Sequence, residues 1–138
     1  MCFIKTINFI EDSRHYITKI LDEDIIVIKV LCRKSVNRIF FKKYIYYSPY
    51  QNYKYIKGKL NISPLGIFIS RMSTNYDYRI VINEGFHSFR TKEDAYKYDL
   101  IGDSRAVLCK CIIPKGSTII YNDSEIVSNQ IIFIEELK

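Results

Sequence analysis

Cationic and aromatic side chains are concentrated in one part of this sequence, where together they could bind an anionic ligand. No acidic residue occurs between Asp24 and Asp77, whereas ten Lys and Arg residues lie there and six tyrosines fall between residues 44 and 55. Cations can bind phosphate oxygens, and rings can stack on bases or sugars. Much of the net charge of +6 is therefore local and favours an anionic partner. Lysines are equally typical of a solvated or edge-protecting strand, so both interpretations remain open.

Two strands are predicted to position these side chains. In residues 25–33 the even positions are apolar, namely Ile26, Ile28, Val30 and Cys32. In residues 38–47 the odd positions Ile39, Phe41, Ile45 and Tyr47 are apolar or aromatic, with Lys43 the exception. Such period-two alternation is typical of half-buried strands. With a turn at residues 35–37, the segment predicts an antiparallel hairpin. Its outer face would carry six ligand-binding side chains, namely Lys29, Arg33, Arg38, Lys42, Tyr44 and Tyr46.

A second group of polar residues lies in the segment GFHSFR at 85–90. His87 follows Gly85 at the start of a predicted cleft, and Arg90 is the nearby cation. These two residues complete the predicted ligand-binding set. A hydrogen-bonded structural histidine is the alternative interpretation of His87, because its two ring nitrogens readily join buried networks.

The remaining elements predict an α+β chain, a single sheet-dominated domain over residues 1–138 that is mainly antiparallel with one or two short helices. Thr91 followed by Glu93 and Asp94 predicts a helix start, with Ala95, Tyr98 and Ile101 buried and Gly102 at its end. Residues 12–22 predict a second short helix, and residues 71–77 a loop. Strands are predicted at residues 53–60, 65–70, 78–82, 105–113, 117–121 and 130–137.

The four cysteines favour buried thiols in a reducing compartment. Cys109 and Cys111 are two residues apart in a predicted strand, so they share a face and are poorly placed for a disulfide. Neither histidine lies near a cysteine pair, and the metal prediction is accordingly none. The first residues lack a signal-peptide core, and no apolar run approaches the roughly 18 residues of a membrane span. We therefore expect a cytoplasmic protein without membrane contact.

The second half resembles small uncharacterised proteins of bacteriophages and large DNA viruses. The resemblance covers residues 78–138 and rests on GFHS at 85–88, a helix, IPKGS at 113–117, an IVS segment at 126–128 and an acidic end. It implies a viral protein acting in the cytoplasm of a host cell, with evasion of host defence as its setting. It brings no established activity with it.

The same region is remotely similar to the C-terminal half of toxin-type ADP-ribosyltransferases. In that family a Ser-Thr-Ser strand precedes a helix, a Pro-Lys-Gly-Ser turn follows, and a Glu-x-Glu segment supplies the catalytic carboxylate. The resemblance implies Ser88 for the first serine, Glu125 for the catalytic glutamate, and Arg33 as the arginine that holds NAD. Phe89 and Arg90 depart from the serine motif, so a strand hydroxyl and a surface acid are the alternatives for Ser88 and Glu125.

Three functions follow as expectations. The first is a non-catalytic binding module for an anionic ligand, such as a nucleotide or a nucleotide-derived signal of host defence, with no cofactor. The second is an ADP-ribosyltransferase-like enzyme using NAD. The third is non-specific or single-stranded nucleic-acid binding, which predicts steep salt dependence. Docking on an acidic host protein and homo-oligomerisation through the tyrosine-rich face also remain open.

Overall fold

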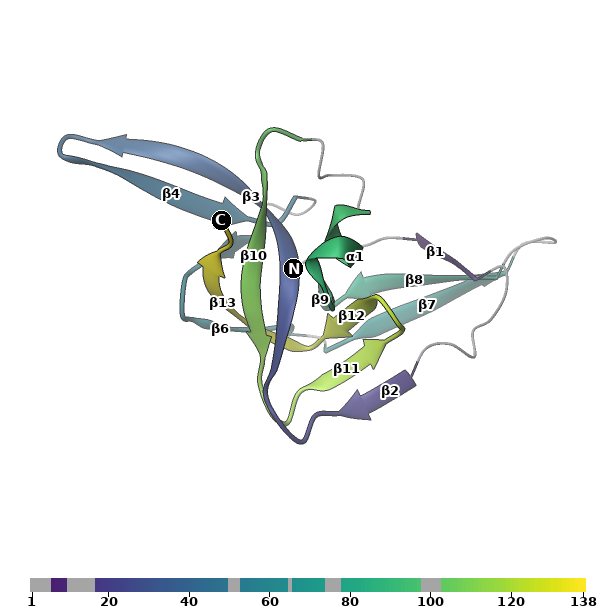
Figure 1. The fold of residues 1–138 in the computed structure, drawn as a ribbon. Coiled ribbons are helices and arrows are strands. Elements are labelled where there is room, and N and C mark those ends of the chain that lie inside the picture. The colour runs from purple at the N-terminus through teal and green to yellow at the C-terminus, as the bar shows by residue number, and fades with distance from the viewer. Residues whose placement is uncertain (1–5, 10–16, 50–52, 65, 74–77, 98–102) are drawn as a thin grey trace.

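The protein is built almost entirely from antiparallel strands, as a computed structural model shows (Figure 1). The structure describes residues 6–9, 17–49, 53–64, 66–73, 78–97 and 103–138. The main path of the larger sheet runs β2 (Ile17–Ile20), β11 (Thr118–Tyr121), β12 (Glu125–Ser128), β9 (Phe86–Phe89), β3 (Ile25–Arg38), β10 (Ala106–Ile113), β13 (Gln130–Glu136) and β6 (Leu60–Ile62). Off this path, β4 (Phe41–Tyr47) pairs with β3 and with β5 (Lys54–Tyr55).

A second, three-stranded sheet has the order β1 (Thr6–Phe9), β8 (Tyr78–Glu84) and β7 (Phe68–Ser73). Gly85 is the single residue between β8 of this sheet and β9 of the larger one. Its φ of +125° lies in a region that favours glycine. A Cβ at this position would lie 2.6 Å from Cγ1 of Val127. The passage of the chain from one sheet to the other therefore depends on glycine here.

The long strands β3 and β10 run side by side through the middle of the larger sheet (Figure 1). Odd residues of β3, such as Val27 and Leu31, pack in the main core with Cys109, Cys111 and Phe133. Even residues of β3, such as Ile28 and Val30, pack on the other face with Phe89 and Ala95. Both faces of β3 are thus covered, which explains its nearly continuous apolar run.

The single helix among the described residues, α1 (Lys92–Tyr96), covers the second face of β3. The Thr91 side chain accepts a hydrogen bond from the Asp94 amide at 3.1 Å, so the predicted cap is confirmed. Ala95 is fully buried, also as predicted, while Tyr98, Ile101 and Gly102 lie outside the described residues. With so short a helix, the sheet-dominated, antiparallel character is confirmed, and the helical part of the α+β prediction is small.

Several strand predictions agree with the structure. The odd positions Cys109, Cys111 and Ile113 of β10 are fully buried, and Cys32, Cys109 and Cys111 are free thiols. Burial raises the pKa of the Cys111 thiol to about 12 and raises that of Cys109 as well, so neither is a thiolate at neutral pH. The turns at Pro114–Gly116 and at Asn122–Asp123 lead into β11 and β12.

Other predictions are wrong. Residues 17–20 form β2 rather than part of a helix, while residues 12–16 lie outside the described part. The side chains of β2 are exposed, so the segment is an edge strand hydrogen-bonded to β11 rather than an amphipathic helix. Residues 53–60 contain only the two-residue β5 and the start of β6, and β7 continues to Ser73 into the predicted loop. The short strands β1 and β12 were not expected, whereas β9 agrees with the strand position that both interpretations gave Ser88.

Candidate functional site: the β3–β4 hairpin

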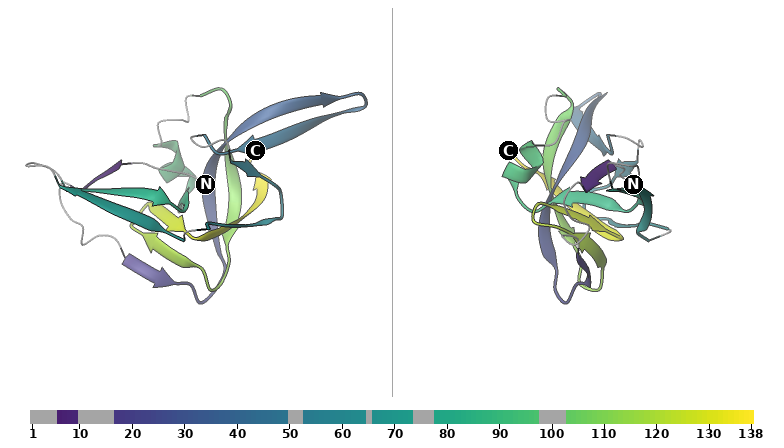
Figure 2. Two further views of the ribbon diagram at one scale, coloured as in Figure 1. Left: turned by 180° about the vertical axis from the view of Figure 1, so that it is seen from behind. Right: turned by 90° about the vertical axis from the view of Figure 1, so that its right-hand side faces the viewer.

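The predicted hairpin is present, and it projects from the body of the protein (Figure 1, Figure 2). Its turn lies at residues 39–40 rather than at 35–37, because β3 runs on through Ser35 to Arg38. The register pairs Arg33 with Tyr46 and Arg38 with Phe41. The hairpin is therefore longer than predicted, and residues expected within a strand lie at its tip.

At the base of the hairpin, Arg33 is held by Glu136 of β13. The Arg33 Nη1 donates to both carboxylate oxygens at 2.9 and 3.1 Å, and the Tyr46 hydroxyl donates to Oε2 at 2.8 Å. The Tyr46 ring packs on Phe133 with the ring centres 4.8 Å apart. Burial and the bond to Glu136 raise the pKa of Tyr46 well above its ordinary value. This set anchors the hairpin, so Tyr46 packs against the body at the hairpin base and is not exposed as the prediction required.

Farther along the hairpin, Tyr44 lies between two cations. The Arg33 guanidinium lies 4.3 Å from the centre of the Tyr44 ring, and the Lys42 ammonium lies 5.5 Å from it. Arg33, Lys42 and Tyr44 thus share a face, as predicted. The side chain of Arg38 lies outside the described residues.

The hairpin tip carries features that the alternation pattern did not identify. Ile39 and Phe40 are 91% and 94% exposed, and Phe41 is 61% exposed. The prediction that Ile39 and Phe41 face inward is wrong, because the turn carries them beyond the body that could cover them. Lys42 and Lys43 are exposed next to this apolar tip, and Lys34 is exposed farther down the hairpin, opposite Ile45. The sequence does contain a signal for such a tip, namely three consecutive large apolar residues, Ile39 to Phe41, with a cation on each side.

Lys29 does not lie on an outer face. It is 1% exposed and lies in the main core, opposite Cys109 in the register. Its ammonium donates to the main-chain oxygen of His87 and lies 5.7 Å from the centre of the Tyr55 ring. β9 pairs with β3 only through Phe89 and Ile28. The bond from the Lys29 ammonium to the His87 carbonyl therefore joins the two strands outside this paired position. The prediction that Lys29 binds ligand on the surface is therefore wrong in placement, because both faces of β3 are covered.

His87 and Glu125 lie together on β9 and β12. The His87 Nε2 is 3.5 Å from the Glu125 Oε1, and these side chains are only 10% and 15% exposed. The His87 ring also lies edge-on to Phe89, with the ring centres 4.9 Å apart. The pairing of β9 with β12 accounts for the largely buried position of both residues. It is consistent with the structural interpretation of His87.

The residues implied by the ADP-ribosyltransferase resemblance are not brought together. Ser88 is opposite Ile126 in the register and donates to its carbonyl at 3.3 Å, on the face of the ladder opposite to Glu125. Arg33 is five residues beyond Ile28, the β3 residue level with Phe89 and Glu125. Five strand residues span roughly 16 Å. Ser88, Glu125 and Arg33 therefore do not form one site.

Arg90 is separate from the hairpin as well. Its Nε donates to the Asn122 carbonyl at 2.9 Å, and its guanidinium lies 4.9 Å from the centre of the Tyr121 ring. Its contacts with the β11–β12 turn are those of a surface residue that orders a turn. Taken with Lys29 in the core and Arg33 at the hairpin base, the predicted ligand-binding residues lie in several places rather than around one pocket.

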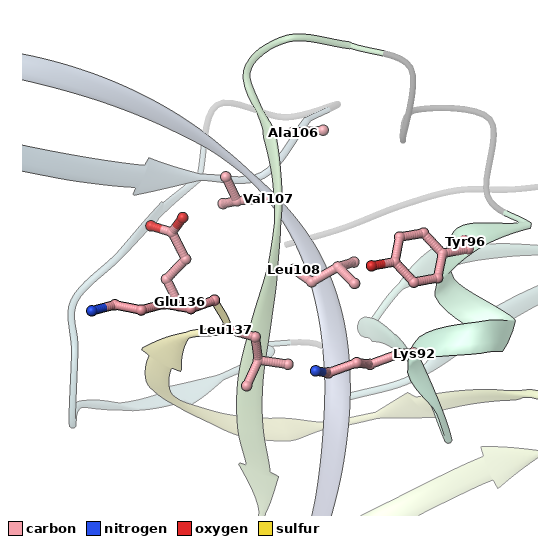
Figure 3. A pocket seen from close by; sticks show the side chains of 8 residues that line it. Lys92, Tyr96, Ala106, Val107, Leu108, Glu136 and Leu137 are labelled. Atoms are coloured by element: carbon pink, nitrogen blue, oxygen red, sulfur yellow. The ribbon is translucent and has the colours of Figure 1, made fainter.

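A surface pocket of about 290 Å³ lies between α1, β10 and the C-terminal residues. Lys92 and Tyr96 of α1 point toward Leu137 and Leu108 across it, and Glu136 lies on the far side of β10 (Figure 3). None of the predicted ligand-binding residues that the structure describes lines this pocket. The pocket therefore gives no support to nucleotide capture by the predicted set.

Neither a metal-ligand cluster nor a membrane-spanning helix is found in the described part of the chain. Within it, no group of three or more His, Cys, Asp or Glu side chains is arranged to hold a metal ion. No helix there is long and apolar enough to cross a membrane. Comparison of the sequence and fold with protein-family models, curated proteins and solved structures found no match.

Proposed function

We propose that this protein is a non-catalytic binding module for an anionic partner, and that the partner is nucleic acid bound by the β3–β4 hairpin. The observation that carries the proposal is the projecting hairpin with exposed Lys34, Lys42 and Lys43 and no acidic residue of its own. All 15 acidic residues of the chain lie outside residues 25–76. Local potential would therefore steer a polyanion to the hairpin.

The shape of the hairpin supports a polymer rather than a small ligand. A two-stranded ribbon with strands about 4.8 Å apart fits the major groove of a duplex, about 12 Å wide, and it can also lie along a single strand. A mononucleotide site would need cations around a concave pocket, whereas the hairpin projects from the body (Figure 2) and its exposed lysines lie at different points along its two strands. Spread cations suit a repeating line of phosphates.

The enzyme alternative gains less support from the geometry. NAD turnover would need Arg33 near Glu125, but the Arg33 guanidinium is bound to Glu136 at the hairpin base. Binding of nucleic acid needs no such convergence. It also suits the phage and viral proteins that the GFHS and IPKGS segments resemble, and a site of action in the cytoplasm of a host cell.

The proposal predicts salt-dependent binding that the hairpin lysines control. Combining Lys34→Gln, Lys42→Gln and Lys43→Gln should weaken binding of a labelled single strand of about 20 nucleotides at least about tenfold at low salt. The slope of log affinity against log salt should become shallower by about 2, since each lost phosphate contact removes about 0.7 for a single strand. Fluorescence anisotropy between about 50 and 300 mM salt, on single strands and duplexes, measures both.

The matched control removes the same charge elsewhere. Lys19, Lys92 and Lys115 are exposed on β2, α1 and the β10–β11 turn, away from the hairpin. Their triple Gln variant should keep most of the affinity. Equal losses in both triple variants, or no binding at about 100 μM protein in about 50 mM salt, would contradict the proposal. Calorimetric binding of a mononucleotide, cyclic dinucleotide or ADP-ribose with micromolar affinity would favour small-ligand capture instead.

A further inference from the structure

The tip of the β3–β4 hairpin has a chemistry that phosphate binding alone does not use. Ile39, Phe40 and Phe41 are consecutive, and all three are largely exposed. Such an exposed apolar cluster costs free energy in water and marks a surface that becomes covered by a partner. The lysines beside it bind phosphate, but they give no reason for aromatic rings at the tip.

We propose that Phe40 and Phe41 form a base-stacking tip that inserts between unstacked bases, so that the protein prefers single strands and bulges over intact duplex. This inference rests on the proposed function. Aromatic side chains stack on the faces of all four bases, and apolar side chains at the ends of projecting elements can separate base steps. Phe40 is at the turn itself and Phe41 begins β4, so both rings are carried at the far end of the projecting hairpin.

Charge complementarity selects nucleic acid among the partners that an apolar tip could serve. Lys42 and Lys43 directly follow Phe41 on β4, and Lys34 lies on β3, opposite Ile45 in the register. Lys42 and Lys43 can therefore meet the phosphates that flank a base held by the tip, and Lys34, farther down the hairpin, can meet a phosphate farther along the strand. A neutral apolar groove on another protein would meet the rings but leave these cations without partners.

Unpaired bases are the preferred target because they need no unstacking beforehand. Insertion into intact duplex has to separate a base step first, whereas a bulge or single strand presents its base faces directly. The stacking and phosphate contacts are then separable: removing a ring should reduce the preference for unpaired bases, while the number of phosphate contacts stays the same.

The chain contains no tryptophan, which makes a direct test available. Phe40→Trp introduces a single reporter at the tip, and its emission should be quenched when a single strand or a bulged duplex is added. Tyr96→Trp places a single reporter on exposed α1, away from the hairpin, and should show no quenching. Quenching of both reporters to the same degree, or of neither, would overturn the inference.

A second variant separates the inference from the proposed function. Phe40→Ala should weaken binding to single strands and bulges about tenfold with little effect on perfect duplex, and it should leave the salt slope unchanged. If the protein binds with the expected salt slope and Phe40→Ala binds every probe as the unsubstituted protein does, the stacking tip is wrong while the proposed function stands. If the protein showed no salt-dependent binding to any probe, both the proposed function and the stacking tip would be wrong.

Other occupants of the tip give distinct outcomes in the Phe40→Trp protein. A blue shift with phosphatidylserine-containing vesicles and no response to nucleic acid would show that the tip enters a lipid surface. A blue shift that rises with protein concentration alone would show that the tip is covered by a second copy of the chain. Either result would overturn the inference.

Discussion

Replacing Lys29 by alanine is expected to lower the free energy of unfolding by about 2–4 kcal/mol. The side chain is 1% exposed, so its methylene groups fill space in the core that alanine would leave empty. Its amine also donates to the His87 carbonyl, which would lose this donor inside the protein. Relief from burying an ammonium group offsets part of both costs. Urea denaturation followed by circular dichroism measures the change.

Lys34→Ala is the matched control, because it removes the same side chain from the exposed part of the same strand. It should change stability by no more than about 0.5 kcal/mol. Lys29→Met adds a second comparison, since it keeps most of the volume and removes only the donor. If Lys29→Ala were as stable as the unsubstituted protein but lost affinity for nucleic acid, Lys29 would be a surface ligand, as its place in the alternation first indicated.

Replacing Gly85 by alanine should also destabilise the protein strongly, by about 2–4 kcal/mol. The backbone has a φ of +125°, where a side chain is strained, and the new Cβ would lie 2.6 Å from Val127 Cγ1. Val127 is itself buried, on β12 beside β9, so neither chain can move apart without disturbing the core. Thermal or urea unfolding of the variant gives the size of the effect.

Two further variants separate strain from crowding at this position. Gly58 also has a positive φ, +78°, but a Cβ there would meet no atom within 4 Å, so Gly58→Ala should cost only about 1 kcal/mol. Combining Gly85→Ala with Val127→Ala removes the crowding atom, so the double variant should lose less stability than the sum of the two single losses. Strict additivity would show that the close approach to Val127 does not contribute.

Short-range patterns were sufficient for several elements. The alternation in residues 105–113 predicted β10 and its buried cysteines, and Thr91 with Asp94 predicted the helix cap. Both depend on residues a few positions apart, where local geometry decides the outcome. The basic, acid-free interval is likewise a property of composition, and it led directly to the hairpin.

Long-range packing decided which side of a strand is covered, and alternation alone could not settle that. In β3 the apolar residues occupy both faces, so the same letters allow Lys29 to point outward or inward. Helix α1, more than fifty residues later in the chain, covers the even face and leaves Lys29 on the side of the main core. Ladder pairing alone cannot supply this information.

The cation-rich interval is thus visible in the sequence, while its division into separate roles depends on tertiary structure. Lys29 is in the core and Arg33 anchors the hairpin on Glu136, whereas Lys34, Lys42 and Lys43 remain exposed along the hairpin. The physical reason is that Glu136 and the covering helix come from segments distant in the chain. Whether a cationic side chain lies in solvent, in the core or against a partner is decided only when these distant segments pack around it.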